Sequence, residues 1–349
     1  MTTETVNRLP MPTYRYLNVN DTKLSFTPPA RCANALFSEE TFITKGTENL
    51  PETFDGASPA LLATALSGER FTIRIPKNTN AALTVILPMT KETPDYAGFF
   101  SFVLEENAKL ALLWQWEGES GGTGVVAATY TLSENATLTE SSVALGLAEK
   151  TIVCQRHVTL ADRAEADFTA ASLGGCETIL HSRGFLFGKK SRLDEAAFYA
   201  ADGNQKQDFF YHIDHIGEES ESNIDVRGAL AGHAKKIFRG TIDFKRGCAG
   251  AVGNESDSVI SLSPYAKNIS LPLLLCTEDN VIGNHASSAG RLDESTVYYL
   301  MSRGLSKEEA HRIVVEALLR PLVDRLPENV RDSVLLAVAK KLEIDGKLE

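Results

Sequence analysis

The sequence predicts an all-β core followed by a small helical domain, and three observations support that prediction. From residue 71 onward, short runs rich in β-branched and aromatic residues recur at intervals of roughly ten to twenty residues. No convincing amphipathic helix separates these runs before about residue 292. After that point, apolar residues return at helical spacing. We therefore divide the chain into an N-terminal segment (1–70), a β core (71–291) and a C-terminal helical domain (292–349).

The N-terminal segment is mixed in character. Its prolines interrupt regular structure because proline fixes its φ angle and has no backbone N–H. One short stretch, PALLATAL at 59–66, looks helical. We therefore expect an irregular segment with one short helix. The prolines are Pro10, Pro12, Pro28, Pro29 and Pro51.

The runs of the β core alternate apolar and polar residues, and Gly, Asn, Asp or Ser punctuate them. A sandwich, a jelly roll and a parallel β-helix all fit this spacing. Two-residue hairpin signals are scarce, the main ones being Asp55-Gly56 and Asp202-Gly203. That scarcity favours a solenoid, in which the chain turns corners and does not fold back, although no fixed sequence repeat decides the matter. Examples of these runs lie at 71–75, 82–87, 99–104, 111–116, 124–132, 151–160, 166–173, 223–230, 236–244 and 268–276.

The C-terminal domain carries clear helix-end signals. Gly304 marks a helix stop, and Ser306 with Glu309 forms the capping-box pattern, in which two backbone N–H donors are satisfied reciprocally. Apolar residues then follow at helical spacing until Pro321, which should end or kink the helix. A second helical pattern occupies 330–342. Helices this short must bury their apolar faces, either against their own body or against a partner protein.

The composition is that of a folded protein, with 43% apolar and 23% charged residues. The chain has 46 acidic and 35 basic residues, and its formal charge of −11 argues against nucleic acid as a partner. Its start lacks the apolar region of a signal peptide, and no run approaches the roughly 20 apolar residues of a membrane span. The five cysteines are scattered and form no CxxC motif, which favours a reducing compartment. We therefore expect a cytoplasmic protein with no membrane partner.

Two short motifs suggest enzymes but have the wrong context. Residues 118–122 (GESGG) match the nucleophile elbow G-x-S-x-G, which needs a helix after the serine, whereas a strand-like run follows at 124–132. Residues 184–191 (GFLFGKKS) are one residue short of the spacing between the glycines of a P-loop. The residues that follow, RLDEAAFYA, could form the helix that a P-loop requires. We predict a Gly-rich loop for the first motif, and no ATP hydrolysis by this chain.

Two pairs of polar residues suggest ligands or acid–base groups. His212 and His215 lie in DFFYHIDHI, which looks like a strand, so they should point to opposite faces and form no chelate by themselves. Asp194 and Glu195 are immediate neighbours, and neighbours do not share a face on a helix or a strand. The acidic run at 218–221 is typical of a solvated loop. We therefore predict no catalytic residue.

Three ordered blocks of the sequence resemble one protein family. Residues 281–294 (VIGNHASSAGRLDE) and 298–305 (YYLMSRGL) resemble the hallmark of the SufB/SufD family of iron–sulfur cluster assembly proteins. That hallmark is a strand ending in a histidine, a small-residue turn, a Gly-Arg/Gln/Lys-Ile/Leu-Asp junction and a Phe-Tyr-Leu-x-Ser-Arg-Gly helix. The block 208–242 is similar to the family's core, and 9–17 (LPMPTYRYL) is similar to the opening of SufD-like members.

This resemblance implies a fold and a role. The fold would be a right-handed parallel β-helix, flanked by an irregular or helical N-terminal segment and a small C-terminal helical domain. The role would be that of a non-catalytic scaffold subunit of the SUF complex, which pairs with a SufB-like chain or with a second copy of itself. The C-terminal helices would dock the ATPase SufC, for which the candidate residues are Tyr299, Arg303, Gly304 and Leu305.

The resemblance also implies iron ligands. In that family a transient iron–sulfur cluster forms near the subunit interface, and by position His285 is the histidine that SufD members contribute. Many SufD-like members have a cysteine two residues before it, where this chain has Gly283. Cys276, at the end of an apolar run, is the thiol candidate, and its alternative role is that of a buried small hydrophobe. Imidazole and thiolate both ligate iron, which suits a transient cluster.

Two other functions remain open at this point. A β-helix that binds or degrades polysaccharide would display aromatic residues and carboxylates along a groove and is commonly secreted. The two tryptophans and the missing signal peptide argue against it. A free homodimer that keeps the fold without the chemistry is the other possibility. The helical C-terminal domain discriminates between the assembly scaffold and the polysaccharide protein, because an ATPase-docking scaffold needs it and a carbohydrate enzyme does not.

Overall fold

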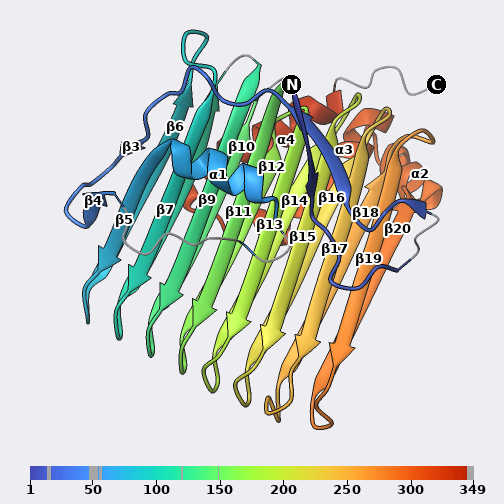
Figure 1. Cartoon of the computed structure of the whole chain (residues 1–349). Coiled ribbons are helices and arrows are strands. Elements are labelled where there is room, and N and C mark those ends of the chain that lie inside the picture. The colour runs from blue at the N-terminus through green and yellow to red at the C-terminus, as the bar shows by residue number, and fades with distance from the viewer. Residues whose placement is uncertain (14–16, 47–53, 55–56, 119–120, 148, 344–349) are drawn as a thin grey trace.

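The computed structural model describes residues 1–343 except 14–16, 47–53, 55–56, 119–120 and 148 (Figure 1). Its body is a parallel β-solenoid of about eight turns, and each turn gives one strand to each of two sheets. The front sheet in Figure 1 contains the odd-numbered strands from β5 onward, and the back sheet contains the even-numbered ones. The predicted parallel β-helix is therefore confirmed over the sandwich and the jelly roll.

Both sheets have nine strands, and each begins with one short antiparallel strand that covers the first turn. The front sheet consists of β4 (Ile43–Lys45), β5 (Glu69–Ile75), β7 (Tyr96–Leu104), β9 (Gly122–Leu132), β11 (Lys150–Leu160), β13 (Glu177–Leu186), β15 (Lys206–His215), β17 (Lys235–Phe244) and β19 (Lys267–Cys276). The back sheet consists of β3 (Leu36–Phe37), β6 (Asn80–Met89), β8 (Lys109–Gly118), β10 (Thr137–Leu145), β12 (Glu165–Leu173), β14 (Arg192–Ala201), β16 (Glu221–Leu230), β18 (Val252–Ser261) and β20 (Ile282–Arg291).

A structural repeat exists although the sequence shows none. The corner that follows each of six front strands contains one residue with a positive φ angle. At three successive corners this residue is an asparagine, and the side-chain amides stack: Asn107 Nδ2 donates to Asn78 Oδ1 at 2.9 Å, and Asn135 Nδ2 donates to Asn107 Oδ1 at 3.2 Å. Asparagine tolerates this conformation better than most residues. The repeat lies in the backbone, which is why the sequence did not reveal it. The six residues are Asn78, Asn107, Asn135, Arg163, Lys190 and Glu219.

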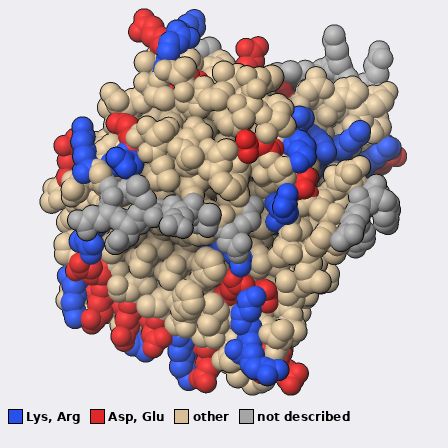
Figure 2. Space-filling view, in the orientation of Figure 1, with Lys and Arg blue, Asp and Glu red and all other residues tan. Residues whose placement is uncertain are grey.

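The corners carry much of the surface charge. Figure 2 shows acidic and basic side chains alternating along the lower edge, where the front strands end. Two of the ion pairs there join successive turns: Arg74 with Glu105 at 3.2 Å and Lys189 with Glu218 at 2.9 Å. Exposed pairs of this kind contribute less than about 1 kcal/mol each.

The solenoid interior is filled by side chains that point inward from both sheets. Because the parallel strands are stacked in register, the side chains of successive turns lie directly above one another. Phe102 stacks on Tyr130 with 4.8 Å between ring centroids, and Trp114 meets Phe100 edge-on at 4.7 Å. Trp116 is buried with them. This aromatic core occupies the early turns.

Charged residues occupy the middle of the interior. Arg156 on β11 bonds to Glu195 on β14 and lies 3.3 Å from Glu140 on β10. Burial raises the pKa of both carboxyl groups, and the Arg156 guanidinium opposes that shift. Asp194, the neighbour of Glu195, pairs on the outer face with Arg192 at 2.6 Å. The two neighbouring acids thus lie on opposite faces of the strand, as predicted.

The N-terminal segment covers the outer face of the front sheet. Its helix α1 (Pro59–Ser67), at the predicted position, begins at the N-cap Ser58 and buries Leu61 and Leu62 against Phe99 and Val125. The antiparallel strands β1 (Thr2–Val6) and β2 (Thr22–Phe26) belong to the same segment. Asn7, Thr22 and Arg239 all bond to the buried Asp208 of β15.

The C-terminal helices cover the opposite side (Figure 1). They are α2 (Glu294–Ser302), α3 (Lys307–Val323) and α4 (Glu328–Glu343), and both bonds of the predicted capping box of α3 are present. Helices α3 and α4 bury Val315, Leu319 and Val334 against Phe198 and other apolar residues of the back sheet. These two helices therefore pack on their own body. No helix in the described part of the chain is long and apolar enough to cross a membrane.

The structure corrects some sequence predictions. Helix α3 does not stop at Pro321 itself but ends two residues later, at Val323. The segment after the P-loop-like motif is strand β14 and not a helix. In the G-x-S-x-G motif, residues 119 and 120 lie outside the described part, and the strands β8 and β9 flank it.

Candidate functional site

The two ends of the solenoid differ. The first turn is covered by the short antiparallel strands β3 and β4. The last turn, made of β19 and β20, has no covering strand in the described part of the chain, so the outer edges of both strands are unpaired. All ten residues of β20 are exposed. An uncovered turn exposes backbone N–H and C=O groups and inward-facing side chains together.

His285 lies on this open turn. It is in register with the buried Glu255 of β18, and residues in register on parallel strands project to the same face. His285 therefore faces the interior side but is exposed, because no further turn covers it. The resemblance implied that the strand ends at His285 and is followed by a turn of small residues. In the structure, β20 continues to Arg291, and the small residues belong to the strand.

Cys276 is the last residue of β19, on the opposite sheet of the same turn. It is in register with the interior Phe244, so it also lies on the inward-facing side. The thiol is exposed, and its Sγ lies 2.9 Å from the carbonyl oxygen of Glu278. The role of a buried small hydrophobe is thereby ruled out. Cys276 and His285 thus share the open turn but come from different sheets.

A group of buried charges lies one turn behind the open end. Lys236 of β17 pairs with Asp257 of β18, and both side chains are almost completely buried. Glu255 is also buried, and neither of its carboxylate oxygens has a hydrogen-bond partner among the described residues. Burial and the nearby Asp257 raise the pKa of Glu255 to about 8. Sequence inspection missed this group, because its members are separated along the chain and follow no motif.

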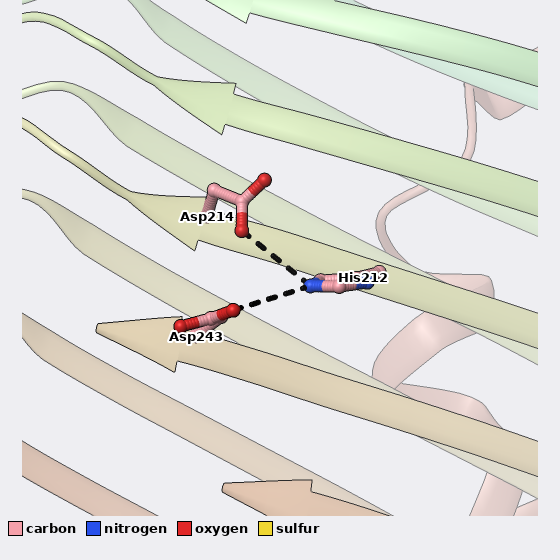
Figure 3. A group of neighbouring side chains, drawn as sticks. All are labelled: His212, Asp214 and Asp243. Atoms are coloured by element: carbon pink, nitrogen blue, oxygen red, sulfur yellow. Dashed lines mark ion pairs between the residues drawn. The ribbon is translucent and has the colours of Figure 1, made fainter. Parts of the chain in front are cut away.

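A second group of ligand-type residues lies on the outer face of the front sheet (Figure 3). His212 Nε2 lies 3.4 Å from Asp214 Oδ1 and 3.8 Å from Asp243 Oδ2. Two cations already compensate these carboxylates, since Arg183 lies 2.6 Å from Asp214 and Lys245 lies 2.5 Å from Asp243. Burial opposes ionisation of both aspartates, but interactions with His212 and with these cations lower the pKa of each. We interpret this group as an ion-pair network.

His215 points to the other face of β15, as predicted. Its ring is fully buried, and the two ring nitrogens lie 2.8 Å from the hydroxyl groups of Ser220 and Ser222. Burial lowers its pKa to about 4. His212 and His215 therefore bind no common ion.

The candidate docking residues cluster around the end of α2. Tyr299 is 56% exposed, and the Arg303 guanidinium lies over its ring at 5.2 Å. Gly304 has φ +97°, a value that favours glycine, and it ends the helix as predicted. A groove of about 880 Å³ separates α2 from the solenoid corners, and Tyr265, Tyr298 and Met301 line it. The aromatic side chains of α2 are thus available to a partner.

Comparisons with known proteins identify relatives of this chain. Residues 93–318 match the family model described as SUF system FeS cluster assembly, SufBD core domain. The chain is 28% identical over 292 residues to the iron–sulfur cluster assembly protein SufD of Bacillus subtilis, covering 81% of this chain and 66% of that protein. Two SufBD family iron–sulfur cluster assembly proteins of Mycobacterium tuberculosis are 27% and 25% identical over 265 and 174 residues. These matches cover 73% and 49% of this chain, and 59% and 21% of the two relatives. The chain thus spans less than two thirds of the curated relatives it matches.

Proposed function

The chain belongs to the SufB/SufD family as a SufD-like member, and from that premise we propose that it is a non-catalytic scaffold subunit of cytoplasmic iron–sulfur cluster assembly. It pairs through the open end of its solenoid with a SufB-like chain or a second copy, and docks a SufC-like ATPase through its C-terminal domain. A nascent cluster, which is cargo and not a resident cofactor, contacts His285 and Cys276. The observation that carries this proposal is the uncovered last turn with both ligand candidates on it.

The β20 edge of the open turn is suited to pairing because few of the features that prevent pairing occur along this strand. Natural edge strands are usually kept from pairing by charges, proline or bulges. β20 reads IGNHASSAGR, and its one charged residue is Arg291 at the end. Small side chains such as Ala286 and Ser287 also let another backbone approach closely. A second β-solenoid that met this edge would bring its own ligands next to His285.

ATPase docking is best assigned to α2 and the turn after it. Helices α3 and α4 have already buried their apolar faces on the back sheet, whereas Tyr298, Tyr299 and Met301 remain exposed. This also changes the design of the test. Deletion of 292–349 would uncover Phe198 and its neighbours, so lost binding could reflect damage to the solenoid. Point variants on α2 avoid that problem.

The first test is affinity purification of the full chain from its own cytosol, with mass spectrometry of whatever co-purifies. We expect a SufC-like ATPase and either a SufB-like chain or a second copy. Tyr299→Ala should lose the ATPase alone. Ser287→Asp, which puts a charge on the open turn, should lose the pairing chain, while the exposed Ser67→Asp on α1 should lose neither. Purification of the wild-type chain without these partners would contradict the proposal.

A polysaccharide-binding role has no comparable support. The tryptophans Trp114 and Trp116 are each only 4% exposed and lie inside the solenoid, so neither is available to stack on a sugar ring. The family match extends through α2 and into α3, ending at residue 318. We therefore retain the scaffold role.

A further inference from the structure

Three lysines begin neighbouring strands of the front sheet and stand in register. Lys206, Lys235 and Lys267 are the first residues of β15, β17 and β19, and each is the Cα partner of the next. Residues in register on parallel strands project to the same face, and neighbouring strands are about 4.8 Å apart. Figure 2 shows basic side chains gathered at the upper right, where these strands begin in Figure 1. We call these three residues the lysine row.

The lysine row has little acidic compensation. Lys206 lies 3.6 Å from Glu177, which holds the preceding position in register. Lys235 and Lys267 form no ion pair within the described part of the chain. Like charges at directly opposed strand positions destabilise a sheet. Burial lowers the pKa of Lys235, Asp208 opposes that shift, and the neighbouring lysines add to it. An anion that binds along the row would relieve this repulsion.

A pocket of about 450 Å³ opens beside the lysine row, between the N-terminal segment and the front sheet. Lys206 and Lys235 line it from the sheet, and Lys23 of β2 lines it from the N-terminal segment. Lys23 donates to the hydroxyl group of Thr5, which is neutral, so that contact leaves the lysine charge uncompensated. Pockets of about 300–1,000 Å³ are typical of small-molecule sites. The size of this pocket therefore fits a small molecule better than a single ion.

The pocket and the lysine row together carry excess positive charge. Arg239 pairs with Asp208 at 2.7 Å, and Lys206 pairs with Glu177, so these two carboxylates are compensated. The carboxylate that remains, Asp21, lines the pocket together with or beside three further cations. These cations are Lys23, Lys235 and Lys267. Two positive charges are therefore left over, which favours an anion with at least two negative charges.

We propose that this pocket binds a small molecule that carries a diphosphate group. The lysine ammonium group binds phosphate as a point charge, and a row of them suits two linked phosphoryl groups better than one round ion. Asn18 and Asn20 line the same pocket and offer neutral polar groups to the rest of the molecule. Because Lys23 belongs to β2 and Lys235 to β17, the ligand joins the N-terminal segment to the solenoid. This site goes beyond the scaffold role, since none of its residues is a candidate for partner docking or for iron binding.

The test is isothermal titration calorimetry of the purified full chain with pyrophosphate, and with orthophosphate and citrate as comparison anions. We expect one equivalent of pyrophosphate to bind more tightly than either, because its two phosphoryl groups span neighbouring lysines. Lys235→Gln and Lys23→Gln should each weaken binding by about tenfold, which corresponds to one lost hydrogen bond to a charged group. Asp21→Asn should strengthen binding, because it removes a carboxylate that repels the anion.

The matched control is Lys109→Gln. Lys109 is also the exposed first residue of a strand, but that strand is β8 of the back sheet. The control removes the same charge and should bind pyrophosphate like wild type.

Three results would overturn the inference: no pyrophosphate binding by the wild-type chain, equal weakening in Lys235→Gln and Lys109→Gln, or citrate binding as tight as pyrophosphate binding. If Lys235→Gln does not fold by circular dichroism, the exposed Lys267→Gln takes its place, and wild-type affinity in that variant would overturn the inference as well. The titration needs no partner protein. Failed co-purification would therefore contradict the proposed function without affecting this result.

Discussion

Replacing Arg156 with methionine should destabilise the solenoid by about 3–5 kcal/mol at pH 7. The Arg156 side chain is 7% exposed, and the paired side chains of Glu140 and Glu195 are 4% and 1% exposed. Methionine fills a similar volume without charge. The two carboxyl groups would then lie in the interior with no cation, although Ser182 still donates to Glu195 at 2.5 Å and Tyr130 still bonds to Glu140.

The size of the effect follows from protonation. A buried carboxylate without a cation becomes neutral, and neutralising a Glu of ordinary pKa 4.5 at pH 7 costs about 3.4 kcal/mol. One such neutralisation already reaches the expected range. At pH 5 the same step costs less than about 1 kcal/mol, so the deficit should shrink. The stability loss grows with pH because an acid whose pKa is raised in the folded state destabilises that state as the pH rises.

Urea unfolding, followed by the fluorescence of the buried Trp114 and Trp116, measures this loss at pH 5 and pH 7. Arg74→Met is the matched control, because its pair with Glu105 is 56% and 39% exposed. That control should change stability by less than about 1 kcal/mol at either pH. A loss below about 1 kcal/mol for Arg156→Met at pH 7, or a loss that does not vary with pH, would refute the reasoning.

Three further predictions concern other parts of the chain. Burial lowers the pKa of His215 from 6.5 to about 4, so the imidazole stays neutral in the folded state at a pH where the unfolded state already binds a proton. The free energy of unfolding should therefore fall by about 3 kcal/mol as the pH falls from 6.5 to 4. Acid titration of wild type and His215→Gln by circular dichroism measures it, and equal acid midpoints would contradict it. Phe198→Ala should cost about 3–5 kcal/mol and expose the C-terminal helices to protease, because Phe198 is buried beneath them; unchanged proteolysis would argue against this packing. Ser306→Ala removes the hydroxyl that accepts from the Glu309 N–H at 3.1 Å and should cost about 1 kcal/mol, seen as faster hydrogen exchange in the first turn of α3. Unchanged exchange there would show that the cap is not needed.

Much of the fold could be predicted from local patterns. The short helix at 59–66 and the capping box at Ser306 depend on side chains within a few residues of each other, and both are present. The strand runs were found where apolar alternation was strong. The alternation is weaker in β10 and β18, which are rich in Ser, Thr and acidic residues. In a solenoid these strands pair on both sides, so polar residues there are tolerated.

The candidate site also contains residues that the sequence predicted and a residue that only the structure revealed. His285 and Cys276 were predicted because a family resemblance covers their segment, and the structure adds that both lie on the open turn. Glu255 could not be predicted, because it is far from His285 along the chain and belongs to no motif. Only the register of β18 against β20 makes them neighbours.

The sequence by itself indicated the β-rich middle, the helices near the C-terminus and the family. Tertiary structure alone decided which end of the solenoid is covered, which face each helix occupies, and which buried carboxyl group has no hydrogen-bond partner among the described residues. The physical reason is that alternation, capping and turn preferences act over a few residues. Strand register joins positions a full turn apart and leaves no local trace in the sequence.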